Sequence, residues 1–115
     1  MSRLTTHVLD IVGGQPGRGV RVRLFRDGDP TPLVDTVTND DGRCSEPLLA
    51  GERFLPGRYR LVFSVADYYR GCGVALDEPP FLDEVELVFG VARVDQHYHV
   101  PLVMSPWSYS TYRGS

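Results

Sequence analysis

Three histidines, His7, His97 and His99, are the side chains of this sequence best suited to acid–base chemistry near neutral pH. His97 and His99 stand two residues apart in a segment whose pattern predicts a β-strand, and alternate residues of a strand point to one face of its sheet. We therefore expect both imidazole rings on one surface. Such a pair can bind zinc, yet no third nitrogen, sulfur or carboxylate ligand lies close in the sequence. Zinc ligation and a structural role through hydrogen bonds both stay open.

Arg43 ends the predicted turn Asp40-Asp41-Gly42-Arg43. On these residues alone it is a solvated turn arginine that pairs with Asp41. The sequence lacks a Gly-x-Ser-x-Gly elbow, a His-Glu-x-x-His helix and a phosphate-binding glycine loop. The local signatures of serine hydrolases, zincins and nucleotide-binding proteins are therefore absent. Every basic residue is arginine, which excludes chemistry that needs a lysine, such as a Schiff base with pyridoxal phosphate.

Length and charge limit the partners that we expect. The chain has 115 residues, 12 basic and 15 acidic, with a net charge of -3, which fits a single domain spanning 1–115. No stretch concentrates positive charge, so we expect neither nucleic acid nor an anionic membrane as a partner. No apolar run approaches the roughly 20 residues that span a bilayer, and no signal peptide is visible, so we predict a cytoplasmic protein.

Cys44 and Cys72 are the only cysteines. Their spacing rules out a Cys-x-x-Cys redox pair and a zinc cage built from cysteines. In a chain without other signs of secretion we expect two reduced, half-buried thiols, although the sequence by itself does not establish whether they are oxidised.

The pattern of apolar residues predicts the elements that must hold these side chains in place. Twelve glycines and nine prolines are spread along the chain, which excludes long helices. Between them apolar and polar residues alternate with a period of two, as in half-buried antiparallel strands. The predicted strands lie at residues 5–12, 20–24, 33–38, 59–65, 84–91, 97–104 and 108–112, and one short helix lies at 66–70, ended by Gly71.

Seven or eight short strands in a chain of this length predict an all-β sandwich of two sheets. The expected core residues are Val20, Leu24, Leu61, Phe63, Leu87 and Phe89.

Both ends of the chain carry longer motifs. The segment Leu4-Thr5-Thr6-His7-Val8-Leu9-Asp10, followed by Gly14-x-Pro16, resembles the N-terminal signature of the transthyretin-like family. The segments His97-Tyr98-His99-Val100-Pro101-Leu102 and Ser105-Pro106-Trp107-Ser108-Tyr109-Ser110-Thr111 resemble its C-terminal signature. Asp41-Gly42-Arg43-Cys44 stands where this family places its arginine. Gly17 and Asp83 depart from the alanine and proline that are usual there, and neither is a functional position.

The last four residues, Tyr112-Arg113-Gly114-Ser115, are similar to the ending of the family's enzymes, whereas transthyretin itself lacks them. The resemblance implies a two-sheet transthyretin-like sandwich of about eight strands and one short helix. It implies a homotetramer with sites at the dimer–dimer interface. It also implies a hydrolase that opens the ring of 5-hydroxyisourate to 2-oxo-4-hydroxy-4-carboxy-5-ureidoimidazoline in urate degradation, a part of purine catabolism, with no cofactor and no metal.

The same resemblance implies roles for individual residues. It implies that His7 and His99 are the pair that activates water and transfers protons. It implies that Arg43 donates hydrogen bonds to the carbonyl oxygens of the substrate. Tyr112 and Ser115 become substrate-binding residues. For His97 we expect a structural or interface role. Two other functions stay open: an apolar carrier on the transthyretin pattern, which the bulk of Tyr112 and Arg113 opposes, and a purely structural module, which would not require these residues together.

Overall fold

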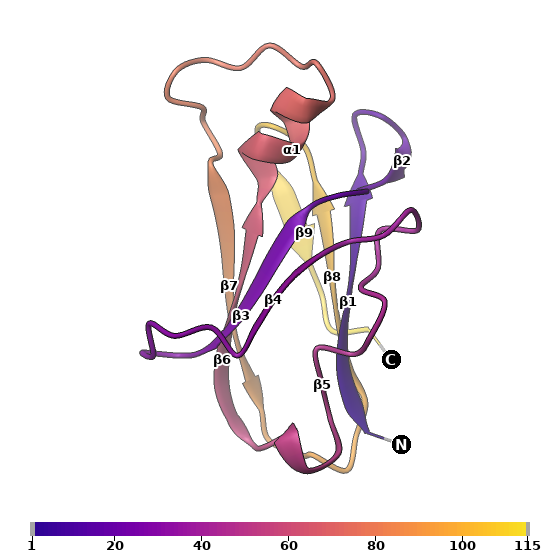
Figure 1. Cartoon of the computed structure of the whole chain (residues 1–115), viewed down its shortest axis with the longest axis vertical. Coiled ribbons are helices and arrows are strands. Elements are labelled where there is room, and N and C mark those ends of the chain that lie inside the picture. The colour runs from indigo at the N-terminus through magenta and orange to yellow at the C-terminus, as the bar shows by residue number, and fades with distance from the viewer. Residues whose placement is uncertain (1, 115) are drawn as a thin grey trace.

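The computed structural model describes residues 2–114 and shows two layers of β-strands with one short helix at an end (Figure 1). The strands are β1 (Arg3–Asp10), β2 (Gln15–Pro16), β3 (Arg21–Arg26), β4 (Val34–Val37), β5 (Leu49–Ala50), β6 (Gly57–Ser64), β7 (Glu84–Val91), β8 (Tyr98–Met104) and β9 (Tyr109–Thr111). A 3₁₀ turn, η1 (Gly51–Arg53), follows β5, and the helix α1 (Val65–Gly71) follows β6. The predicted all-β sandwich is confirmed.

The two sheets differ in how their strands pair. One has the order β4-β3-β6-β7 with antiparallel neighbours throughout, as the alternation predicts. The other has the order β2-β1-β8-β9, with β5 also paired to β1. In it β1 and β8 run parallel, from Leu4 opposite Tyr98 to Asp10 opposite Met104. The prediction of antiparallel strands is wrong for this pair, because alternation shows which face is buried and not the direction of a partner strand.

The core lies between the sheets and contains the predicted residues. Five of the six are buried, and Phe89 is only partly buried. Phe89 lies on β7, which is an edge strand of its sheet and so has a neighbouring strand on one side only. Its ring stacks on Tyr59, with ring centroids 6.0 Å apart. The alternation thus predicted the buried face correctly and overestimated burial at the edge.

Helix α1 ends later than predicted. Gly71 is its last helical residue, and the left-handed backbone conformation falls on Gly73, with φ of +82°. The N–H groups of Gly73 and Val74 donate to the carbonyls of Arg70 and Tyr69, which is the Schellman arrangement at a helix C-terminus. Within residues 2–114, no helix is long and apolar enough to cross a membrane.

The two cysteines are both free thiols. Cys44 is half-buried and Cys72 is exposed just after α1. The expectation of two half-buried thiols is therefore wrong for Cys72. Burial raises the pKa of the Cys44 thiol, which keeps it protonated near neutral pH.

Candidate active site

The predicted histidine surface forms on the outer face of the sheet that contains β1 and β8. Along β1 the residues Leu4, Thr6 and Val8 point into the core, so Thr5 and His7 point outward. The parallel register sets Thr5 opposite His99 and His7 opposite Pro101. The prediction that the two histidines of the His-x-His motif share a face is confirmed, since the rings of His97 and His99 stack at 6.4 Å with an angle of 12° between their planes.

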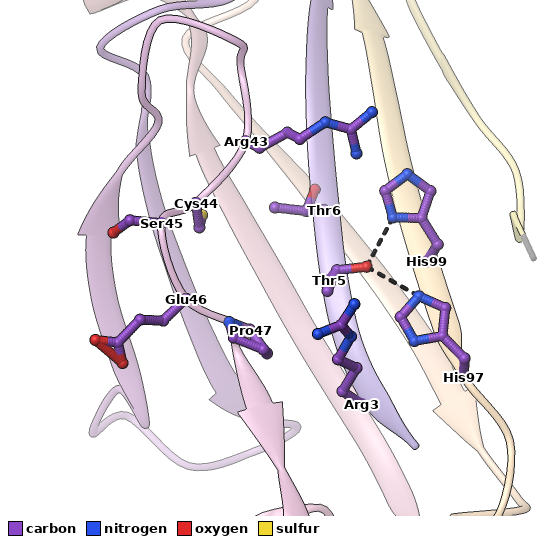
Figure 2. A pocket seen from close by; sticks show the side chains of 10 residues that line it. All are labelled: Arg3, Thr5, Thr6, Arg43, Cys44, Ser45, Glu46, Pro47, His97 and His99. Carbon is purple, nitrogen blue, oxygen red and sulfur yellow. Dashed lines mark hydrogen bonds between the residues drawn. The ribbon is translucent and has the colours of Figure 1, made fainter. Parts of the chain in front are cut away.

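Thr5 joins these two rings by hydrogen bonds. Its Oγ1 lies 2.8 Å from Nδ1 of His99 and 3.3 Å from Nε2 of His97 (Figure 2). Sequence reasoning missed Thr5. The signal was present, because Thr5 stands two residues before His7 and so had to share its face, but the partner strand was not known.

The Arg43 loop is held against β1 by its backbone. Gly42 takes the left-handed conformation with φ of +77°, and a Cβ there would lie 2.4 Å from the carbonyl oxygen of Val8. This close approach lets Val8 N–H donate a 2.8 Å hydrogen bond to the carbonyl of Gly42, and Arg43 forms a β-bridge with His7. The loop therefore delivers Arg43 to the histidine face from about 35 residues away along the chain.

The expected pairing of Arg43 with Asp41 does not form, and among the described residues no carboxylate lies within 4.0 Å of its guanidinium. Instead the Arg43 side chain extends across β1 on the side of His99 (Figure 2). The backbone carbonyl of Asp41 accepts a 2.8 Å hydrogen bond from Nε2 of His7. Because a carbonyl only accepts, this nitrogen of His7 carries a proton, and in the neutral ring the lone pair is on Nδ1.

Two clefts meet at His97 and His99. The first, of about 480 Å³, is lined by Arg3, Thr5, Thr6, Arg43, Cys44, Ser45, Glu46, Pro47, His97 and His99. The second, wider and of about 880 Å³, is lined by Gln96, His97, His99, Tyr112, Arg113 and Gly114. His7 lines neither cleft, and its ring lies 6.5 Å from that of His99. The structure thus brings His99 and Arg43 together in the first cleft, with the His7 ring near that of His99. Tyr112 lies in the second cleft, which also contains His97 and His99.

The electrostatics of the site favour a neutral His99. Burial lowers the pKa of His99 below its ordinary value of 6.5, and the positive charge of Arg43, followed by those of His7 and His97 when protonated, lowers it further. An uncharged imidazole at pH 7 can accept a proton from water. Within residues 2–114, no three His, Cys, Asp or Glu side chains lie close enough together to hold a metal ion.

The C-terminal segment is attached to the site. Gly114 N–H donates to the carbonyl of His99 at 2.7 Å, and the Arg113 guanidinium lies 3.9 Å from the centre of the Tyr98 ring. Tyr112 lines the second cleft with 61% of its surface exposed. Ser115, predicted to bind substrate, lies outside the described residues.

A sandwich of these two sheets with a histidine and arginine cleft on its outer face defines a transthyretin-type fold with a polar site. The sequence profile of the HIUase/Transthyretin family matches residues 4–114, and the chain belongs to that family.

Relatives match this chain over its whole length. A 5-hydroxyisourate hydrolase of Pseudomonas aeruginosa is 59% identical, covering 100% of this chain and 93% of that protein. The solved structure of Klebsiella pneumoniae 5-hydroxyisourate hydrolase superposes with a TM-score of 0.83 at 34% identity and covers 100% of both chains. The crystal structure of an (S)-allantoin synthase superposes with a TM-score of 0.94 at 44% identity over 99% of this chain, which spans 44% of the length of that protein.

Proposed function

We propose that this protein is a hydrolase that opens the ring of 5-hydroxyisourate to 2-oxo-4-hydroxy-4-carboxy-5-ureidoimidazoline in urate degradation. The observation that carries the proposal is the shared cleft of His99 and Arg43, a weak base beside an arginine that has no carboxylate partner among the described residues. The full-length relatives that are named 5-hydroxyisourate hydrolases support the same reaction.

His99 is the proposed general base. Water adds through its oxygen to a ring carbonyl carbon of the substrate while its proton passes to Nε2 of His99. The ring C–N bond then breaks, the nitrogen takes up a proton, and the product carries a carboxylate and a ureido group. A base whose pKa lies somewhat below the working pH is unprotonated and ready, and such catalysis contributes about 10²–10⁴-fold.

Arg43 is the proposed donor to the oxyanion that develops as water adds. A guanidinium presents several N–H groups in a planar fork and accepts nothing, so it suits carbonyl oxygens that gain negative charge. Removal of one such donor costs about 10²–10³-fold in turnover. The Arg43 fork and the His99 ring face the same cleft (Figure 2), which allows both to act on one bound molecule.

His7 and Tyr112 complete the proposed site. The Nε2–H of His7 donates its hydrogen bond to the Asp41 carbonyl, so only Nδ1 of His7 is available to accept or donate a proton in the reaction. Tyr112 closes the substrate pocket from the second cleft. Ser115 keeps its predicted substrate-binding role within this proposal.

We further propose that the chain assembles as a homotetramer with sites at the dimer–dimer interface. Tyr112 is exposed in the single chain, whereas a residue that closes a pocket should be covered. A neighbouring subunit would cover it. Ile11, Val12 and Trp107 are also exposed, by 57%, 53% and 62%, and follow the adjacent ends of β1 and β8. Large apolar side chains left exposed in this way are typical of residues that an interface covers. Light scattering should show a tetramer, and an active monomer would contradict the assembly.

The activity is tested with fresh 5-hydroxyisourate, made in place by urate oxidase and followed by its ultraviolet decay. The purified protein should accelerate the decay, and a chelator should leave the rate unchanged, because the proposed chemistry needs neither metal nor cofactor. His99→Ala should lose about 10²-fold or more while staying folded. The matched control is Arg58→Ala, which removes an exposed residue of β6 in the other sheet that lines neither cleft. Decay at the spontaneous rate would overturn the proposal. The cytoplasmic location and the single domain over 1–115 stay predictions.

A further inference from the structure

The hydroxyl of Thr5 lies between two imidazole nitrogens, 2.8 Å from Nδ1 of His99 and 3.3 Å from Nε2 of His97. A hydroxyl has one proton to donate. At most one of the two nitrogens can accept that proton, so at least one of them must donate its own N–H to the hydroxyl oxygen. The protonation states of His97 and His99 are therefore linked through Thr5.

The charge of Arg43 selects the direction of this chain of hydrogen bonds. Arg43 lies over the side of the His99 ring that is opposite the Thr5 hydrogen bond (Figure 2). A guanidinium attracts a lone pair and repels an N–H, so the lone pair of His99 belongs on Nε2. His99 then donates its Nδ1–H to Thr5, and Thr5 donates its O–H to Nε2 of His97.

We propose that Thr5 and His97 are positioning residues that hold His99 as the tautomer with its lone pair toward the cleft and that relay its proton. This inference rests on the proposed function. When Nε2 of His99 takes the proton of water, the Nδ1 proton moves to Thr5 Oγ1 and the Thr5 proton moves to Nε2 of His97. The positive charge thereby leaves His99 and appears on His97. When Nε2 of His99 gives its proton to the departing ring nitrogen, the shift runs in reverse, from Nε2 of His97 through Thr5 to Nδ1 of His99, and restores the starting state.

The location of His97 suits this role. His97 lines both clefts, so the positive charge that it takes up during the relay can be solvated in the second cleft. The two rings stack nearly parallel, and each turns one nitrogen to Thr5. The other titratable or charged groups around the pair are His7 and Arg3 on β1, Arg43, Cys44 and Glu46 on the loop before β5, and Tyr112 and Arg113 in the C-terminal segment.

Thr5→Val tests the hydroxyl, because valine keeps the shape and removes both hydrogen bonds. ¹⁵N NMR of the imidazoles, without substrate, should show His99 as the Nδ1–H tautomer in the wild type and a shift toward Nε2–H in the variant. The kcat should fall about tenfold or more with KM nearly unchanged, and the acid limb of its pH profile should move. Thr5→Ser should restore both readouts. Thr36→Val, a threonine on β4 in the other sheet, is the matched control.

His97→Gln separates positioning from relay. The glutamine amide can keep an acceptor near the place of Nε2 but takes up no proton at neutral pH, so the His99 tautomer should persist while kcat falls. His97→Leu should lose both. If Thr5→Val keeps the wild-type tautomer and kcat in an active enzyme, the inference is overturned and the proposed function stands. If the wild type shows the Nδ1–H tautomer but no hydrolysis, the proposed function fails instead.

Discussion

The backbone N–H of Gly114 donates a 2.7 Å hydrogen bond to the carbonyl oxygen of His99, and the lack of a side chain at Gly114 permits this approach. A Cβ on Gly114 would lie 2.9 Å from Cδ2 of His99, which is closer than real Cβ contacts. The end of the chain thus packs directly on the proposed base.

Gly114→Ala should therefore disturb the site more than the fold. Gly114 and Thr5 lie on opposite sides of β8, so the added methyl group must displace the His99 ring from its present place against Thr5. We therefore expect about a tenfold loss of turnover, in line with the cost of misplacing a catalytic group. The melting temperature should change by only a few degrees, as for a loss of about 1 kcal/mol. Gly71→Ala, at a glycine with open space around it, is the control and should leave turnover unchanged. Full activity in Gly114→Ala would show that His99 tolerates displacement.

Removal of residues 112–115 should separate stability from turnover. The core lies between the sheets and β9 ends at Thr111, so the truncated protein should melt close to the wild type. Turnover should fall by orders of magnitude, because Tyr112 and the Gly114 contact with His99 are both lost. The measurement is calorimetry beside the ultraviolet assay. A truncated protein with full activity would show that the tail has no part in the reaction.

The pH dependence should report the lowered pKa of His99. Because the neutral ring is the active form, kcat/KM should rise with pH on the acid side and reach half its maximum below pH 6.5. Arg43→Gln removes a positive charge that lowers this pKa, so the half-maximum should move to higher pH while turnover falls about 10²–10³-fold. Arg43→Lys keeps the charge and should keep the pH of the half-maximum, although the loss of the fork still lowers turnover. A profile that is unchanged in Arg43→Gln would contradict the assignment of His99 as the base.

Asp10 should stabilise the fold only while its carboxylate is ionised. Its Oδ1 accepts from the Val12 and Gly13 N–H groups and from the Tyr69 hydroxyl, and its Oδ2 accepts from the Tyr68 hydroxyl. Burial by itself would raise the pKa of Asp10, but these four donors together bring it below the ordinary 3.8. Since the folded pKa is the lower one, the stabilisation is present above the unfolded pKa and is lost as pH falls through the folded value.

Asp10→Asn should accordingly cost about 2 kcal/mol in the free energy of unfolding at pH 7. The difference from the wild type should shrink as the pH falls below about 3.8. Denaturant unfolding at several pH values measures it, with Asp77→Asn on an exposed loop as the control. A difference that does not depend on pH would mean that the charge of Asp10 contributes nothing.

Much of the fold followed from local pattern. Strand β7 has the predicted bounds, Glu84–Val91, because its residues alternate between core and solvent and each obeys the period of two. The two-residue strands β2 and β5 were missed, since a segment that short has no period to detect. The residue types able to do acid–base chemistry, His7, His97 and His99, were likewise plain from the sequence, as was the shared strand face of His97 and His99.

What brings these side chains together was decided by tertiary contacts. Thr5 and His99 are 94 residues apart, and only the parallel pairing of β1 with β8 sets the hydroxyl between the two rings. Arg43 reaches the cleft because Gly42 packs on the backbone of Val8. Local pattern reports which face of a segment is buried, because burial acts on each residue separately. The local pattern carries no information on which strand a segment pairs with, in which direction, or in which register, because these depend on how distant segments pack.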